Sequence, residues 1–293
     1  KSEYLKRTEE EKRMTISDEE LEKLADSLDM NLLTVLINNY DYTGIYTECP
    51  MDSALSQLAC SIYWSDQSSE NDKKTYESIK KELSIKKDAD GYDFTAVSDE
   101  MDRFNIVFSK KAVETIGYIL MNEKIEPGKI WKNEGDDDYR MYLTSEKEAA
   151  ICMVDSADVS EMQPLIKFTK KTINKENKQI ELEFTTPIST EKKTYNWKMK
   201  AIIVPSSNEI GYTIKSVESL GYLTEDELKE IASALNVPED LEVTFYQGYP
   251  DYWDAAGIYD FAVDVICEGE TIASTNIDLD YGEMTRGTFM YGE

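Results

Sequence analysis

The amino-acid sequence predicts an α+β protein, in which N-terminal helices precede helices packed on a curved antiparallel sheet and a small C-terminal α+β unit follows. Two observations support this fold class. Before Gly128 the apolar residues recur every three or four positions, and after it they alternate, as in half-buried strands. Short turn-forming clusters separate the strands, and such short connections join antiparallel neighbours. Helices followed by a run of strands are typical of α+β architecture.

Residues 1–48 form the first predicted domain, a charged tether followed by a helical segment. Residues 1–15 carry charged side chains at so many positions that a helix formed by them would be charged on nearly every side, which is typical of a solvated tether. Ser17 and Glu20 then form the capping-box pattern that begins a helix. Leu21, Leu24 and Leu28 recur on one face of that helix.

The same pattern of a capping box followed by regularly spaced apolar residues occurs again far along the chain. Thr224 and Glu227 repeat the capping box, and Leu228, Ile231 and Leu235 repeat the apolar row. Two interpretations remain open, a duplicated unit or two independent solutions to beginning an amphipathic helix. In either case each copy opens a structural unit, which places a domain boundary before residue 221.

Residues 49–220 form the second predicted domain, in which helices precede an antiparallel meander. Apolar spacing predicts helices over residues 52–64 and 70–83, and a third that begins at Ser109 and stops before Pro127. Residues 104–108 fit either a short strand or a helix end. Alternation predicts strands at residues 139–143, 149–154, 165–173, 179–185, 193–204 and 211–217.

Residues 221–293 form the third predicted domain, the small α+β unit. It begins with the second copy of the capped helix and continues into strands at residues 241–246, 258–267 and 271–277. Among the four cysteines, Cys60, Cys152 and Cys267 lie in apolar runs and are predicted to be small buried hydrophobes. Cys49 precedes a proline, and whether it pairs with Cys60 is left open by the sequence.

Three segments of the second domain carry a resemblance to a known group of proteins. Ile180–Phe184, Tyr195–Val204 and Gly211–Ser219 resemble the final strands of small cone-shaped α+β domains of the nuclear-transport-factor-like or cystatin-like kind, as in exported lipoproteins of low-GC Gram-positive bacteria. The resemblance covers about residues 50–220 and implies helices packed on a curved antiparallel sheet. It includes no functional motif and therefore identifies no site residue.

Charge and composition exclude several function classes. The chain has no histidine, and 59 acidic residues outnumber 32 basic ones, which gives a formal net charge of −27. Without histidine, Ser-His-Asp and Cys-His catalysis and His-ligated zinc are excluded. The negative charge opposes binding to nucleic acids and to anionic lipid. No apolar run approaches the ~20 residues of a membrane span, whereas a start at Lys1 fits a signal peptide or lipid anchor upstream.

The segment from Tyr246 to Tyr259 is the candidate ligand-binding site. Aromatic rings flanked by acids bind sugars or peptides, and Tyr and Trp dominate contact hot spots. The alternative is a long hairpin loop whose rings fold back over the sheet edge. The candidate residues are Tyr246, Tyr249, Asp251, Tyr252, Trp253, Asp254 and Tyr259.

The sequence contains no complete metal, phosphate or nucleophile motif. Residues 276–282 and 86–91 resemble calcium loops, but their glycines or final acids are misplaced, and the acidic run 136–138 is typical of a solvated turn. No glycine-rich phosphate loop and no Gly-x-Ser-x-Gly occurs. We therefore expect no metal, no cofactor and no catalytic residue.

These observations predict a non-enzymatic, exported or cell-surface protein that binds a glycan or a protein partner. Two alternatives remain. A carboxylate-dependent glycan hydrolase would need two facing acids in a cleft, one with a raised pKa. An acidic cytosolic partner-binding protein would be favoured if all four thiols were free and buried.

Overall fold

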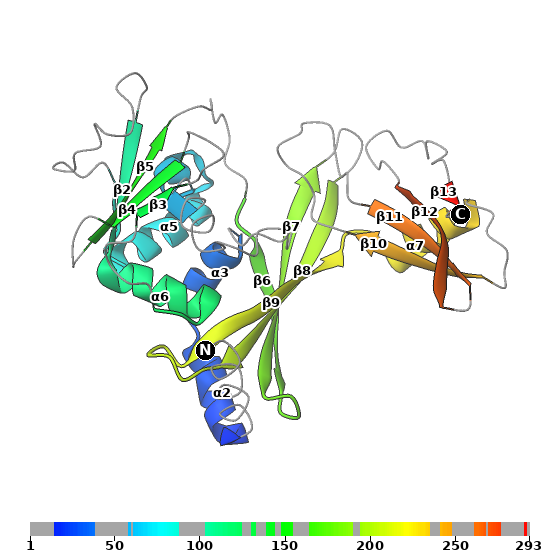
Figure 1. Cartoon of the computed structure of the whole chain (residues 1–293), viewed down its shortest axis with the longest axis horizontal. Coiled ribbons are helices and arrows are strands. Elements are labelled where there is room, and N and C mark those ends of the chain that lie inside the picture. Colours follow the sequence, from blue (N-terminus) through cyan, green and yellow to red (C-terminus); the bar gives the residue numbers. More distant parts are fainter. Residues whose placement is uncertain are drawn as a thin grey trace. The chain divides into compact units, whose positions relative to one another are not determined.

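A computed structural model describes residues 15–38, 58–59, 61–87, 103–124, 130–132, 139–143, 148–154, 164–189, 194–234, 241–247, 261–267, 269–276 and 290–291 (Figure 1). These residues form helices and antiparallel sheets, which confirms the predicted α+β class. Contacts divide the chain into two compact units. Unit 1 comprises Lys1–Leu182 with Ala201–Val217, and unit 2 comprises Glu183–Lys200 with Glu218–Glu293.

Helix α2 (Asp18–Ser27) begins with the predicted capping box. The backbone N–H of Glu20 donates to the Ser17 hydroxyl at 3.2 Å, and the Glu20 carboxylate accepts from the Ser17 backbone N–H at 2.9 Å. This exchange satisfies backbone donors that the first turn of a helix leaves unpaired. Leu21 and Ala25 are buried on one face of α2, as the apolar spacing predicts.

Three further helices build the apolar centre of unit 1. Helix α3 (Met30–Asn38) buries five apolar residues, and α5 (Glu70–Glu82) follows the short 3₁₀ helix η1 (Trp64–Gln67). Ser109 caps α6 (Lys110–Met121), as predicted, by accepting from the N–H of Ala112 at 3.1 Å. Its hydroxyl also donates to the carbonyl of Leu83 at 2.8 Å, which ties the start of α6 to the end of α5.

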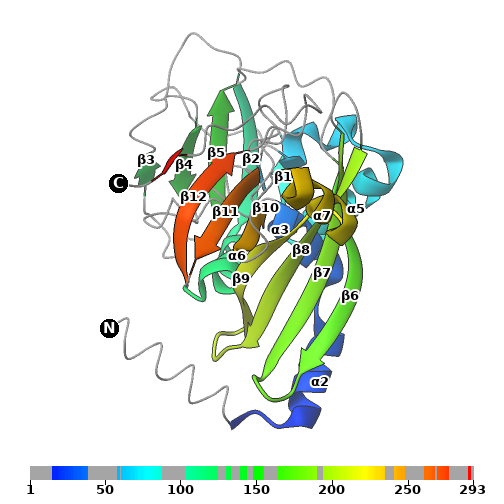
Figure 2. The ribbon, with the colours of Figure 1, turned by 90° about the vertical axis from the view of Figure 1, so that its right-hand side faces the viewer.

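A five-stranded sheet in unit 1 has the strand order β1-β2-β5-β4-β3. Its centre is the antiparallel pair β2 and β5, and α6 packs against both strands (Figure 2). Residues 104–108 therefore belong to a strand, which settles the alternative left open by the sequence. The strands are β1 (Lys86–Lys87), β2 (Arg103–Ser109), β3 (Ile130–Lys132), β4 (Tyr139–Leu143) and β5 (Glu148–Val154).

The strands after Gly128 do not form the single meander that their alternation predicts. Strands β3 to β5 join β2, whereas β6 (Lys167–Asn174), β7 (Gln179–Ser189), β8 (Thr194–Pro205) and β9 (Tyr212–Gly221) form a separate four-stranded sheet in sequence order. The physical reason is the position of β5. Because β5 pairs with β4 on one side and with β2 on the other, it has no free edge for β6.

The turn between β8 and β9 is fixed to the end of α6 by Asn208. Its side-chain amide donates to the carbonyl of Tyr118 at 3.2 Å, to Oδ1 of Asn122 at 2.9 Å and to the carbonyl of Tyr212 at 2.8 Å. Its side-chain oxygen accepts from the N–H of Gly211 at 2.8 Å. Gly211 has a φ of 88°, a conformation that glycine adopts without strain.

Unit 2 contains helix α7 (Glu225–Ala234) and a sheet with the order β10-β11-β12-β13. The predicted capping box of α7 is confirmed, because Thr224 and Glu227 exchange backbone hydrogen bonds of 2.8 and 3.3 Å. The three predicted strands correspond to β10, β11 and β12. The strands are β10 (Glu242–Gln247), β11 (Phe261–Cys267), β12 (Glu270–Asn276) and β13 (Met290–Tyr291).

The two capped helices lead into different structures. Among the described residues, α2 is followed by another helix, α3, whereas the next described element after α7 is the strand β10. Within the described part of the chain, no helix combines the length and apolar character that crossing a bilayer requires.

Candidate functional site

The aromatic segment predicted to bind ligand connects two paired strands. Tyr246 lies on β10 opposite Ala262 of β11, and the pairing ends at Gln247 and Phe261. The backbone therefore holds the two ends of residues 248–260 together, an arrangement that fits both interpretations of the segment. The other six candidate residues lie outside the described residues: Tyr249, Asp251, Tyr252, Trp253, Asp254 and Tyr259.

The C-terminal part of the chain carries more than half of the net negative charge. Residues 221–293 contain 17 acidic and 2 basic side chains, a formal charge of −15 out of −27 for the whole chain. A charge of one sign confined to a small unit produces a potential that attracts cationic ligands and partners. The total charge of the sequence does not reveal this asymmetry, whereas a count of charges by domain does.

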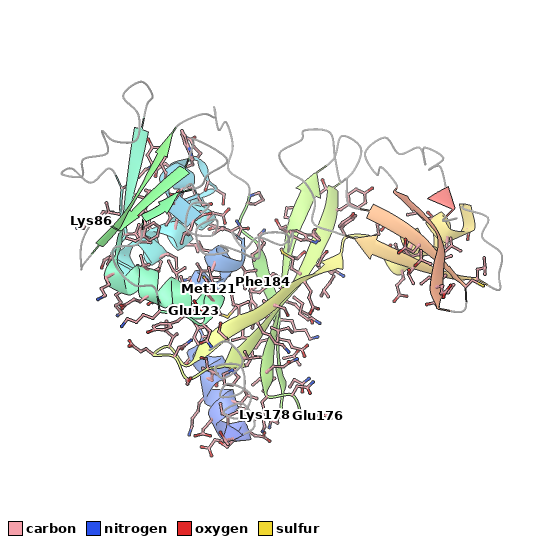
Figure 3. All side chains as sticks on the ribbon, viewed as in Figure 1. Lys86, Met121, Glu123, Glu176, Lys178 and Phe184 are labelled. Carbon is pink, nitrogen blue, oxygen red and sulfur yellow. The ribbon has the colours of Figure 1, made fainter. Side chains whose placement is uncertain are left out.

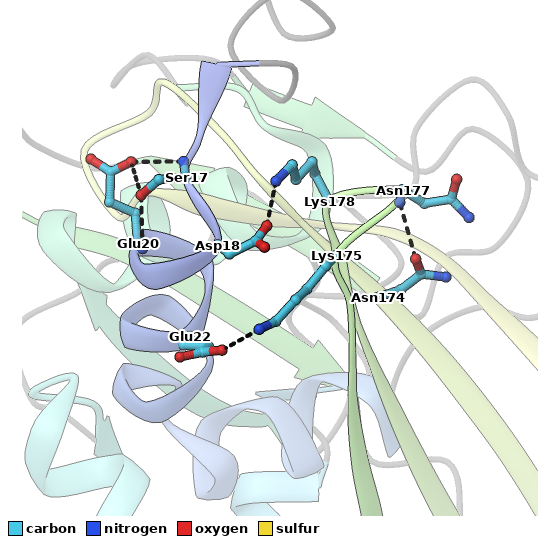
Figure 4. A network of polar contacts seen from close by, with 8 residues as sticks. All are labelled: Ser17, Asp18, Glu20, Glu22, Asn174, Lys175, Asn177 and Lys178. Atoms are coloured by element: carbon cyan, nitrogen blue, oxygen red, sulfur yellow. Dashed lines mark hydrogen bonds and ion pairs between the residues drawn. The ribbon is translucent and has the colours of Figure 1, made fainter.

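Helix α2 shows how an acidic amphipathic helix docks in this protein (Figure 4). Its apolar face is buried, and one flank of acidic residues faces lysines on the β6–β7 hairpin of unit 1. Figure 3 shows Lys178 at the tip of that hairpin. The three ion pairs are Asp18–Lys178 at 2.6 Å, Glu22–Lys175 at 2.7 Å and Asp26–Lys171 at 3.1 Å.

These ion pairs shift the titration of their members. The hydrogen bond from Lys178 lowers the pKa of Asp18, and the hydrogen bond to Glu22 raises the pKa of Lys175. Both shifts favour the charged forms. The docked helix is therefore held by burial on one face and by complementary charges beside it.

Two carboxyl groups meet where α3 begins and α5 ends. Asp29 accepts hydrogen bonds from the backbone N–H groups of Asn31 and Leu32, each at 3.0 Å, and so caps α3. A hydrogen bond between the carboxyl groups of Glu82 and Asp29 raises the pKa of Glu82, and burial and the charge of Asp29 add to this shift. Glu82 therefore keeps its proton to a higher pH than an isolated glutamate does.

A buried tyrosine from β9 lies near the same pair. Tyr212 is 5% exposed, and burial raises its pKa to about 12, with further contributions from Asp29 and Glu82. Lys111, near the start of α6, acts in the opposite direction and favours the ionised form of Glu82. The cluster thus combines side chains from three helices and one strand of unit 1.

A carboxylate-dependent hydrolase requires one carboxyl group that donates a proton and a second that accepts one. However, Asp29 already caps α3, and Glu82 is exposed rather than enclosed. Sequence analysis missed the pair. The sequence indicates that Asp29 caps a helix, because it precedes the apolar run that forms α3. Nothing in the sequence indicates that Glu82 contacts Asp29.

Among the described residues, no group of three or more acidic or cysteine side chains is placed so that it could hold a metal ion. The two calcium-like segments, 276–282 and 86–91, lie mostly outside the described residues, and the acidic run 136–138 lies entirely outside them. Cys267 on β11 has a free, half-buried thiol, and the backbone of Cys152 lies in β5. Cys49 and Cys60, whose pairing the sequence leaves open, lie outside the described residues.

Comparison of the chain with protein-family models, curated proteins and solved structures yields no match. The function therefore has to be inferred from the residues of this chain.

Proposed function

We propose that this protein is a non-enzymatic binding protein, exported or attached to the cell surface, and that residues 246–259 bind its ligand. The observation that carries the proposal is the series of five aromatic residues and two aspartates that begins with Tyr246 on β10 and continues through the segment joining β10 to its paired strand β11. Paired strands give a binding segment a firm base, and loops on rigid scaffolds commonly carry recognition residues.

The chemistry of the segment favours a glycan or a protein surface as ligand. Tyrosine and tryptophan offer flat apolar faces with a hydrogen-bonding group at the edge, and the aspartates add acceptors for hydroxyl or amide donors. The strongly negative C-terminal part of the chain opposes anionic ligands such as nucleic acids.

The proposed location rests on two sequence features. The strands within residues 180–219 resemble those of exported lipoproteins, and the charged residues 1–15 suit a tether between an anchor and a folded part. A lipid anchor or signal peptide upstream of Lys1 belongs to the same proposal.

Thermal shift tests the binding site. The full chain is heated with oligosaccharides of glucose, mannose and N-acetylglucosamine and, separately, with Ca²⁺. We expect at least one oligosaccharide to raise the Tm, and Trp253→Ala to abolish that rise. Phe168→Ala is the matched control, because Phe168 is a partly exposed aromatic residue on β6, and it should leave the rise unchanged. A rise that survives Trp253→Ala, or no rise with any oligosaccharide, contradicts the proposal for glycans.

A carboxylate-dependent glycan hydrolase is the second candidate function. The contact of Asp29 with Glu82 and the raised pKa of Glu82 favour it. This candidate requires that Glu82→Gln abolish release of reducing sugar while Trp253→Ala leaves some turnover. Loss of glycan binding in Trp253→Ala, with no sugar release from the unmodified chain, favours the binding protein instead.

A further inference from the structure

Helix α2 is a separately capped unit that a short link joins to α3. Its first turn is closed by its own capping box, in which Ser17 and Glu20 each accept a hydrogen bond from the backbone N–H of the other. At its other end, Leu28 adopts an extended conformation with φ −62° and ψ 129°, which ends the helix. Because α3 begins at Met30, the link between the two helices consists of Leu28 and Asp29.

The hydrogen bonds of this link serve α3. The carboxylate of Asp29 accepts from the backbone N–H groups of Asn31 and Leu32, and its carbonyl accepts from the N–H of Leu33 at 2.9 Å. Asp29 thereby satisfies the first turn of α3 without help from α2. A rotation of the backbone at Leu28 consequently leaves both helices intact.

Along its length α2 docks on one element, the β6–β7 hairpin (Figure 4). Among the described residues, the ion pairs and side-chain hydrogen bonds between α2 and other elements all go to lysines of this hairpin. Lys171 also donates to the carbonyl of Ala25 at 2.8 Å and so satisfies a carbonyl in the last turn of α2. The C-terminal turn of α2 is therefore bound by the hairpin rather than by the start of α3.

The same contacts can form between two copies of the chain. Burial of Leu21 and Ala25 and the three ion pairs are equivalent whether α2 docks on its own hairpin or on that of a second copy, so the hinge and the protein concentration decide between the two arrangements. Short hinges favour exchange between copies, and the link of Leu28 and Asp29 is short. The net charge of −27 opposes association, but at about 150 mM salt charges more than about 8 Å apart are screened, whereas the direct ion pairs persist.

We infer that α2 is exchanged between two copies of this chain, so that each α2 docks on the β6–β7 hairpin of the other copy. The partner is a second copy, and the contacts between the copies are those that the single chain forms in Figure 4. Each copy gives one helix and receives one, which closes the assembly as a dimer. The inference does not depend on residues 246–259 or on what they bind.

Reciprocal charge reversal in the full chain tests the exchange. The first variant, Glu22→Lys/Asp26→Lys, makes α2 repel any hairpin that keeps its lysines. The second variant, Lys171→Glu/Lys175→Glu, makes the hairpin repel any α2 that keeps its acids. In a mixture of the two variants, complementary contacts arise only between different copies, because each α2 then matches the hairpin of the other variant.

Analytical ultracentrifugation at about 150 mM NaCl, with one of the two variants fluorescently labelled, measures the association. We expect the mixture to form a heterodimer whose dissociation constant is at least about tenfold lower than that of either variant alone, because like-charge contacts are replaced by opposite-charge contacts. The unmodified chain should show a monomer–dimer equilibrium that depends on its concentration.

Two controls separate exchange from general attraction and from misfolding. Lys198→Glu/Lys215→Glu makes the same change in net charge at exposed lysines of β8 and β9, and it should form no heterodimer with Glu22→Lys/Asp26→Lys. Combining both reversed pairs in one chain restores complementary contacts within that chain. This combined variant should match the unmodified chain in Tm and in dimer formation.

Four results overturn the inference. The unmodified chain stays monomeric up to its solubility limit, or the mixture of the two reversed variants forms no heterodimer. The control mixture with Lys198→Glu/Lys215→Glu associates as tightly as the reciprocal mixture. The combined variant keeps the lowered Tm of the single reversals, which would show that these lysines do not hold α2.

Discussion

The side chain of Asp29 both caps a helix and changes the pKa of a neighbouring carboxyl group. One of its oxygens caps α3, and its carboxyl group also forms the hydrogen bond that raises the pKa of Glu82. An acid with a raised pKa in the folded state binds its proton more tightly there than in the unfolded chain. The pair therefore favours folding at low pH, and this advantage is lost as the pH rises from 4.5 through the raised pKa of Glu82.

Replacing Glu82 should consequently stabilise the protein at neutral pH. Glu82→Gln removes the repulsion with Asp29, and the new amide can still donate a hydrogen bond to the Asp29 carboxylate. We therefore expect the free energy of unfolding at pH 7 to rise by about 0.5 kcal/mol. The value is small because Glu82 is exposed. Near pH 4 the difference should vanish. Urea unfolding at both pH values measures it, with Glu123→Gln as a control that changes neither. Destabilisation by Glu82→Gln at pH 7 would contradict this account.

Residue-level prediction from the sequence succeeded where the cause is local. Ser17, Ser109 and Thr224 were all expected to begin helices, and the hydroxyl of each accepts a hydrogen bond from the backbone N–H three residues ahead. The pairing of Asp29 with Glu82 depends on how α3 and α5 pack, and no short-range pattern contains that information. The role of the aromatic residues around Trp253 remains a prediction.

At the scale of elements, burial and ion pairs contribute unequally to the docking of α2. Leu21 is fully buried, whereas Lys175 and Glu22 are each about half exposed, at 52% and 50% of their side chains. Exposed pairs are screened by solvent and salt. The apolar face should therefore hold the helix, and the charges should select its orientation.

Two substitutions separate these contributions. Leu21→Ala removes a buried side chain and should lower the free energy of unfolding by about 2–4 kcal/mol. Lys175→Ala removes one exposed ion pair and should have a much smaller effect that 1 M NaCl abolishes. Urea unfolding at low and high salt checks both. A larger effect for Lys175→Ala than for Leu21→Ala would show that the ion pairs, not the apolar face, hold α2.

Helices and strands were predictable from the sequence because the spacing of apolar residues that identifies them is a local pattern. The alternating segments gave strands close to β4 through β9, and helical spacing gave α5 and α6. Division of the strands into two sheets was not predicted, because β2 lies before α6 in sequence and pairs with β5 after it. Alternation identifies a strand but not its neighbour.

At the scale of the whole molecule, the distribution of charge is the strongest functional signal. Residues 221–293 hold 17 acidic side chains and 2 basic ones. In unit 1, by contrast, lysines of the β6–β7 hairpin pair with the acidic side chains of α2. The aromatic segment and α7 both belong to this acidic C-terminal part. This distribution of charge and aromatic residues supports the proposed binding of a ligand or partner.

The most direct test of this account is the mass spectrum of an oligosaccharide that raises the Tm, recovered after prolonged incubation with the full chain at pH 5 and pH 7. The account predicts that the oligosaccharide is recovered intact at both pH values, although its binding saturates and is lost in Trp253→Ala. Shortened products that appear with the unmodified chain and disappear with Glu82→Gln would contradict the account and identify the protein as a hydrolase.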